Sequence, residues 1–301
     1  MTQHFAVPGM AMGESWFMAP ERRRYTRFMS EDIDAIELFE VERLLDEISS
    51  GVAFFGDGEP AGEWGAWLRF VLPRCLHRAH EPLGDSLLEA LVTAFINVYW
   101  DGVAETKPAG YRGFREDVLL TLGCCLMAPA LWSERLDPGR TVPFPHRGLA
   151  HVQRESALSA SLFLCMRMLE AKEVGDWVQS LVDIESPWWK IHFLRWLELA
   201  WPRLASPAEL PGSLLNTRPD IGWHGVSTFT RNRERPPTGF LSAQRVEAFT
   251  ASLRHHLTAD RYLAWMDELY AVPEIAVEPE VRHTTERVFS VLFGVLGLVV
   301  H

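Results

Sequence analysis

The sequence predicts an all-α protein, a multi-helix globular bundle of about ten helices with one long irregular loop. Three observations support this fold class. Apolar residues recur at helical spacing along most of the chain, capping residues and prolines separate these stretches, and strand patterns are few. Only residues 226–230 alternate as a strand does, and 52–55 form a short apolar run. Neither has an obvious partner strand, so no sheet is expected.

Two helices are predicted in the first quarter of the chain. The first follows Ser30, a residue type that caps helix N-termini, and its apolar stripe stops at Gly51. The second covers residues 64–80. Pro73 lies inside it and should kink or split it, because proline removes a backbone hydrogen bond.

The middle of the chain holds the most apolar helical stretches. Residues 85–100 and 114–128 are apolar almost all round, and Pro129 ends the second. A helix without a polar face is surrounded by protein. We therefore expect these two helices at the centre of the core, together with residues 156–170, whose small side chains allow close approach.

The next helix has clear boundary signals. Ser186 and Pro187 are suited to its N-cap and first positions, and Pro202 should follow its last turn. Beyond it, residues 204–241 show little periodicity and several prolines. Irregular loops of this length are commonly functional or disordered.

Three further helices are predicted near the C-terminus, over residues 242–257, 258–270 and 285–300. Thr258 is a good cap between the first two, so we expect a tight helical hairpin. The whole chain then divides into four segments. They are an N-terminal extension that is partly irregular (1–29), a main helical domain (30–203), a long loop (204–241) and C-terminal helices packing on the main domain (242–301).

The charge balance disfavours some classes of partner. The chain has 29 Lys and Arg against 40 Asp and Glu, a net charge of −11. Such a chain repels nucleic acids and anionic membranes at long range. The longest apolar run, 288–300, is shorter than the roughly 20 residues that span a bilayer, and no secretory signal pattern opens the chain. We expect a cytoplasmic protein with no nucleic-acid and no membrane partner.

Motifs for catalysis or metal binding are missing from the sequence. His77 and His80 share a helix face, but Cys75 points elsewhere and no further ligand is evident. A di-iron bundle needs an ExxH motif on two helices and two further glutamates, whereas this chain has one ExxH, from Glu280 to His283. We expect no metal and no cofactor, and the sequence leaves open whether the protein is an enzyme.

The most polarised stretch lies between residues 31 and 47, where eight acidic residues accompany one base, Arg43. An acidic helix face can dock a basic protein and speed its capture. The sequence therefore favours an acidic helical binding protein that captures a basic protein partner, such as an immunity-type inhibitor. The predicted contact residues are Glu31, Asp34, Glu37, Glu40 and Asp46. The alternative is a solvated face that the arginines before it partly neutralise.

A second hypothesis is a helical enzyme or carrier with a tryptophan-lined apolar pocket gated by residues 204–241. The chain has twelve tryptophans, several of them on one helix, and the loop holds alternating arginines next to a Trp-His pair. The candidate ligand-binding residues are Trp189, Trp196, Trp223, His224, Arg231 and Arg233. The alternatives are core packing for the tryptophans and a solvated loop for the rest.

Overall fold

The computed structural model describes most of the chain. The described residues are 2–15, 19–55, 62–80, 85–100, 102–103, 111–124, 126–127, 149–205, 223, 240–276 and 279–290. Most of the predicted long loop lies outside the described residues, and so does the strand-like run 226–230 within it. Residues 291–301, which include most of the helix predicted over 285–300, also lie outside them.

The predicted all-α fold class is confirmed, because eleven α-helices account for most of the described residues. Their bounds are α1 (Leu38–Phe55), α2 (Gly62–Cys75), α3 (Asp85–Val98), α4 (Phe114–Val118), α5 (Leu149–Met168), α6 (Val174–Val182), α7 (Pro187–Ala205), α8 (Ala243–His256), α9 (Ala259–Tyr270), α10 (Pro273–Ala276) and α11 (Pro279–Phe289). None of the helices described is both long enough and apolar enough to cross a bilayer.

Shorter elements fill the N-terminal segment and two junctions. They are η1 (Thr2–His4), β1 (Gly13–Glu14), β2 (Ala19–Arg23), η2 (Thr26–Met29), η3 (Ile33–Ala35), η4 (Leu76–His80) and the π-helical turn η5 (Leu119–Gly123). The strands β1 and β2 pair antiparallel, with Gly13 opposite Arg23. The sequence did not predict this small hairpin.

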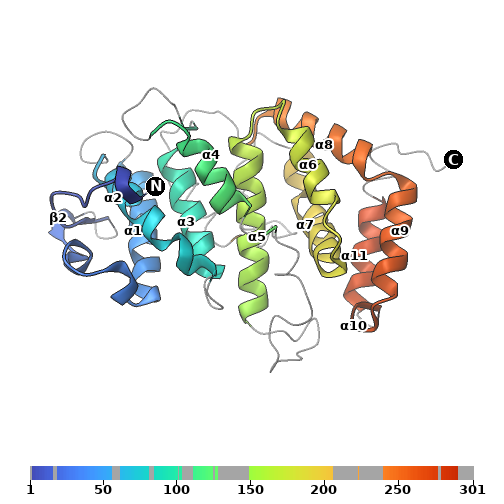
Figure 1. Cartoon of the computed structure of the whole chain (residues 1–301), viewed down its shortest axis with the longest axis horizontal. Coiled ribbons are helices and arrows are strands. Elements are labelled where there is room, and N and C mark those ends of the chain that lie inside the picture. The colour runs from blue at the N-terminus through green and yellow to red at the C-terminus, as the bar shows by residue number, and fades with distance from the viewer. Residues whose placement is uncertain are drawn as a thin grey trace.

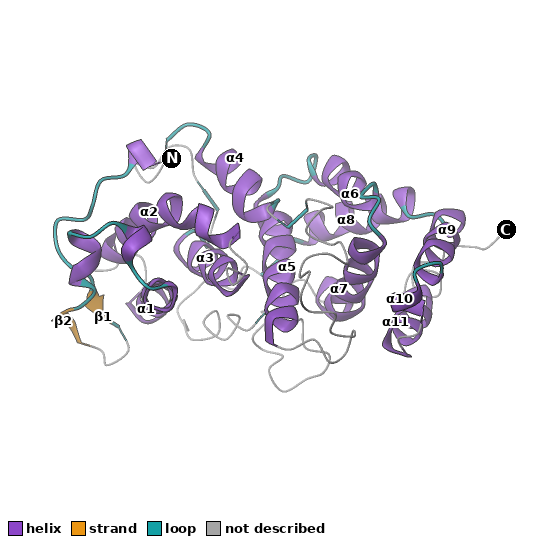
Figure 2. Cartoon of the chain, turned by 60° about the horizontal axis from the view of Figure 1, so that its bottom comes forward, coloured by secondary structure: helices purple, strands orange, loops and turns teal. Residues whose placement is uncertain are grey.

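The helices are arranged along the long axis of the molecule broadly in chain order, except that α11 returns to lie against α7 (Figure 1). In the core, α3 packs between α1 and α5, and α5 also packs against η5 and α8. Farther along, α6 packs on α8, while α7 packs on α9 and α11. Figure 2 shows the same succession from a second direction. Each helix therefore buries its apolar face mainly against neighbours in this row.

The first helix begins later than its sequence pattern indicates. The prediction that it starts at Ser30 is wrong, because Ile33–Ala35 form a 3-10 turn and α1 begins at Leu38. The guanidinium of Arg78, far along the chain, donates to the carbonyls of Ile33 and Ile36 at 3.0 and 2.7 Å. Those oxygens then accept bonds from another element, and the chain does not continue as a regular helix.

The prediction that the first helix stops at Gly51 is wrong, because α1 continues to Phe55. Residues 52–55 are therefore helical and do not form a strand. A β-carbon at Gly51 would lie 2.4 Å from the indole ring of Trp64. The glycine therefore allows α1 and α2 to approach closely. Pro73 splits the next predicted helix, because α2 ends two residues after it and continues as the 3-10 turn η4.

The helix predicted over 114–128 is shorter and irregular. After α4 it widens into the π-helical turn η5, which ends at Gly123. The hydroxyl of Thr121 donates to the carbonyl of Asp117 at 2.6 Å, a side-chain bond typical of distorted helices. The expectation that protein surrounds this stretch is correct on one side only, since η5 packs on α5 but Leu120 is 69% exposed.

The boundary signals of α7 are correct at one end only. The Ser186 hydroxyl accepts a hydrogen bond from the backbone N–H of Trp189 at 3.2 Å, as an N-cap does. At the other end α7 continues through Pro202 to Ala205, contrary to the prediction. Leu204 in this extra turn is buried, so apolar burial offsets the hydrogen bond that proline cannot make.

The predicted hairpin of two C-terminal helices is wrong in its packing. Thr258 caps α9 as expected, its hydroxyl accepting from the N–H of Arg261 at 3.3 Å. However, α8 packs against α6 and α5 instead of lying along α9. The ring of Phe249 meets Trp177 and Trp196, about 6 Å between centroids. This aromatic contact determines where α8 lies.

Candidate functional site

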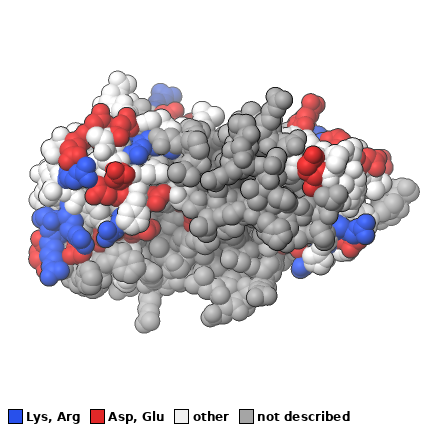
Figure 3. Space-filling model, turned by 90° about the horizontal axis from the view of Figure 1, so that it is seen from below, with Lys and Arg blue, Asp and Glu red and all other residues white. Residues whose placement is uncertain are grey.

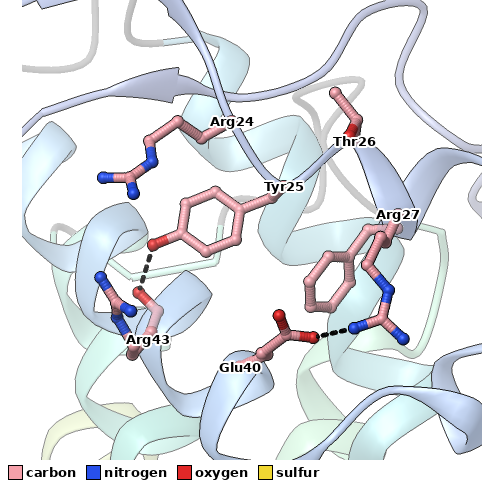
Figure 4. Close-up of a pocket in the computed structure, with 7 residues that line it drawn as sticks. Arg24, Tyr25, Thr26, Arg27, Glu40 and Arg43 are labelled. Carbon is pink, nitrogen blue, oxygen red and sulfur yellow. Dashed lines mark hydrogen bonds and ion pairs between the residues drawn. The ribbon is translucent and has the colours of Figure 1, made fainter.

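A pocket of about 200 Å³ lies between the segment that follows β2 and the first turns of α1 (Figure 4). Its lining combines three arginines with one carboxylate, two aromatic rings and a hydroxyl. The lining residues are Arg24, Tyr25, Thr26, Arg27, Phe28, Glu40 and Arg43. Glu40 belongs to the acidic set predicted from the sequence, so this pocket adjoins the predicted binding face.

Tyr25 has an unusual backbone in this pocket. Its φ and ψ of 59° and 34° are left-handed, a conformation that few bulky residues adopt. Its hydroxyl donates to the carbonyl of Arg43 at 3.3 Å and lies 3.5 Å from a carboxylate oxygen of Glu47. Burial, and secondarily the Glu47 charge, raises the pKa of Tyr25 to about 12. The phenol therefore stays protonated at neutral pH and acts as a hydrogen-bond donor.

Buried carboxylates hold the N-terminal segment in place behind Tyr25. Glu47 accepts hydrogen bonds from the backbone N–H and the hydroxyl of Ser15, the latter at 2.6 Å. Glu14, also buried, forms ion pairs with Arg24 at 2.5 Å and with Arg22 at 3.5 Å. These contacts join the β1–β2 hairpin to α1 and fix the wall of the pocket.

Arg27 links two of the predicted acidic residues. Its guanidinium forms two hydrogen bonds with Glu31, at 2.8 and 2.9 Å, and an ion pair with Glu40 at 2.6 Å. The bonds from Arg27 lower the pKa of Glu31. All three side chains are well exposed, so these pairs are of the kind that contributes little to stability and can exchange.

The remaining predicted acidic residues do not lie on one helix. Asp34 is in the 3-10 turn η3, where it contacts His77 at 2.8 Å. Glu37 is exposed just before α1, and Asp46 is exposed on α1 itself. The structure thus distributes the five residues over a turn, a junction and a helix around one end of the molecule.

An exposed aromatic side chain lies among these charges. Phe39, in the first turn of α1, is 66% exposed, and the guanidinium of Arg43 lies 5.7 Å from its ring centroid. Phe39, Arg43 and Asp46 are spaced by four and three residues and share the outer face of α1. The sequence analysis missed Phe39 and Tyr25. The available signal was two adjacent apolar residues, Leu38 and Phe39, of which one helix face can bury only one.

The tryptophans of the second hypothesis lie in the core. Trp189 and Trp196 both stack on Phe193, with centroids 5.8 and 6.0 Å apart. Trp223 is 1% exposed, stacks on Phe163 and donates its indole N–H to Thr93 at 3.0 Å. Aromatic rings therefore occupy the space around all three. His224, Arg231 and Arg233 lie outside the described residues, and a ligand pocket there stays a prediction.

The left-handed backbone of Tyr25 gives a testable prediction. We expect Tyr25→Gly to be more stable than Tyr25→Ala by about 1 kcal/mol, because only glycine adopts this conformation without strain. Both variants lose the ring, so their difference isolates the backbone, and urea unfolding measures it. At most positions alanine would be the more stable, and that result at residue 25 would contradict a strained backbone.

In the described part of the chain, no three His, Cys, Asp or Glu side chains are grouped as metal ligands would be. No protein family matches this chain, and no curated protein and no solved structure is similar enough to match it.

Proposed function

We propose that the protein is a binding module that captures a basic protein partner at its N-terminal end. The observation that carries this proposal is the exposure of Phe39, which contacts Arg43 and shares its face of α1 with Asp46. Binding hot spots are commonly aromatic side chains near the centre of an interface, with polar and charged residues around them. Phe39 provides such an anchor on α1, and Glu37 lies two residues before it.

The surrounding charge supports a basic partner. Figure 3 shows acidic and basic side chains side by side over the N-terminal elements, at the left of the view. Arg22, Arg23, Arg24 and Arg27 are each paired with a glutamate, whereas Glu37 has no ion pair among the described residues. Together with the net charge of −11, this leaves an acidic excess that would steer a basic protein.

The polar pairs at this end support exchange upon binding. The ion pair of Arg27 with Glu31 and the hydrogen bond between His77 and Asp34 lie at the surface, and their members are 38–60% exposed. Such pairs contribute about 0–1 kcal/mol, so a lysine or arginine of a partner can replace them at little cost. Glu31, Asp34, Glu37, Glu40 and Asp46 are then the residues that the partner contacts.

Capture from lysate of the protein's own cells tests the proposal. The immobilised full chain should retain a basic protein at low salt and release it at raised salt, and mass spectrometry identifies it. With that partner purified, Phe39→Ala should weaken binding about ten-fold or more. The double variant Glu37→Lys and Asp46→Lys should weaken binding and flatten its salt dependence.

A matched control separates local from global charge. Asp267→Lys with Glu274→Lys makes the same change in net charge on exposed residues of α9 and α10, at the other end of the row. This control should leave the affinity and its salt slope nearly unchanged. Equal slopes for the two double variants, or full affinity in Phe39→Ala, would place the interface elsewhere.

A further inference from the structure

Two cysteines far apart in sequence meet where the π-helical turn η5 packs on α5. Cys124 directly follows η5 and is half-buried, while Cys165 lies in the last turn of α5 and is 1% exposed. The two thiols are hydrogen-bonded to each other. Neither forms a disulfide in this structure.

The backbone approach at this point is unusually close. A β-carbon on Gly123 would lie 2.6 Å from the sulfur of Cys165, so only glycine fits beside that thiol. The N–H of Cys124 donates to the carbonyl of Thr121, which closes the turn and holds Cys124 next to the contact. π-Helical turns are rare and occur frequently at functional sites. Here the turn and the glycine bring the two sulfurs together.

Cys124 and Cys75 differ in the direction of their pKa shifts. The hydrogen bond from Cys165 lowers the pKa of Cys124 to about 7, against the opposing effect of burial. This shift favours the thiolate form of Cys124, and the thiolate is the nucleophile. Burial raises the pKa of Cys75 to about 12, so this cysteine stays protonated and serves as an internal reference.

We propose that Cys124 and Cys165 form a redox-active dithiol that a hydroperoxide oxidises to a disulfide. Cys124 is the half-exposed attacking thiol, and Cys165 is the buried resolving thiol behind it. The product is a covalent link between η5 and α5. This inference is independent of partner capture at the N-terminal end.

The reaction balances with hydrogen peroxide as the two-electron oxidant. The Cys124 thiolate attacks one peroxide oxygen, the O–O bond breaks, and the released hydroxide takes up a proton to form water. Cys124 is then a sulfenic acid. The Cys165 sulfur attacks the sulfur of Cys124 and gives up its proton, the S–O bond breaks, and a second water leaves. Two thiols and one peroxide yield one disulfide and two waters.

Peptide mass spectrometry after mild peroxide treatment of the full native chain tests the proposal. After the peroxide treatment, the remaining free thiols are blocked with N-ethylmaleimide before digestion. The digest is then searched for a link between the peptides of Cys124 and Cys165. Because Cys125 shares a peptide with Cys124, the single variants Cys124→Ser and Cys125→Ser identify the linked residue. We expect the link to persist in Cys125→Ser and to be lost in Cys124→Ser.

The variant Cys165→Ser separates the two chemical steps. It should trap Cys124 as a sulfenic acid, which dimedone labels, and should form no internal link. In the wild type at pH 7, maleimide should modify Cys124 at least about a hundred-fold faster than Cys75. A link that involves Cys125 or Cys75 instead, or a peroxide-treated wild type without any Cys124–Cys165 link, would overturn the proposal.

Discussion

Replacing Arg167 by methionine is expected to lower the free energy of unfolding by about 3 kcal/mol. Arg167 lies near the end of α5 and is 8% exposed. Its guanidinium donates to the carbonyls of Trp100 and Phe240. Methionine fills a similar volume but donates nothing, so it leaves two buried acceptors without these bonds, at about 1–3 kcal/mol each.

The same guanidinium also packs on two aromatic rings. It lies 4.1 Å from the ring centroid of Trp100 and 5.3 Å from that of Phe240. Trp100 follows α3, and Phe240 precedes α8, so one side chain of α5 joins three parts of the chain. The side chain of Arg245 donates in turn to the carbonyl of Arg167. Loss of the Arg167 side chain should therefore also weaken the packing of α8 on α5.

Urea unfolding of the full chain measures the effect of Arg167→Met. Arg167→Lys should be intermediate, because an ammonium keeps the charge but lacks the planar fork that reaches both carbonyls. Arg254→Met on the exposed surface of α8 is the matched control and should change stability by less than about 0.5 kcal/mol. If Arg167→Met cost no more than Arg254→Met, the hydrogen bonds of Arg167 would contribute nothing net to the fold.

Gly51→Ala is expected to destabilise the protein by about 3 kcal/mol, although alanine is the better helix former. The added methyl group would lie 2.4 Å from two ring carbons of Trp64, which is fully buried. Neither the ring nor the backbone of α1 can move without disturbing the core. Overpacking of this kind costs about 1–3 kcal/mol or more.

Gly65→Ala provides the matched control in the neighbouring helix. Its β-carbon would meet only the flexible end of Arg69 at 3.2 Å and Val98 at 3.5 Å. This substitution should be neutral or stabilising by up to about 1 kcal/mol, as glycine to alanine is inside a helix. Adding Trp64→Phe to Gly51→Ala should restore part of the loss, because the smaller ring leaves room for the methyl group. Additive losses in that double variant would argue against contact between residues 51 and 64.

Local sequence signals predicted the elements whose causes are themselves local. The Ser186 and Thr258 caps are correct because each hydroxyl bonds to a backbone N–H three residues away. The apolar character of residues 85–100 correctly placed α3 in the core. The helical fold class follows from such short-range hydrogen bonds and from the periodic burial of apolar residues. Both depend on residues close together in the sequence.

Candidate site residues were predictable only in part. The sequence drew attention to the acidic stretch between residues 31 and 47, and Glu40 does line the pocket. It could not show that Arg27 bridges Glu31 and Glu40, since the tertiary structure determines which of several nearby charged side chains an arginine contacts. The left-handed backbone of Tyr25 could not be predicted from the sequence either, because it depends on how the β1–β2 hairpin and α1 pack around that residue.

By itself the sequence determined that this chain is helical, that it is acidic, and which stretches form most of its core. The tertiary structure decided where α1 begins, because Arg78 takes the carbonyls of Ile33 and Ile36 out of a regular helix. It also decided that Gly51 is a packing position beside Trp64 and that Cys124 meets Cys165. These contacts join residues more than ten positions apart, so they exist only once the helices have packed.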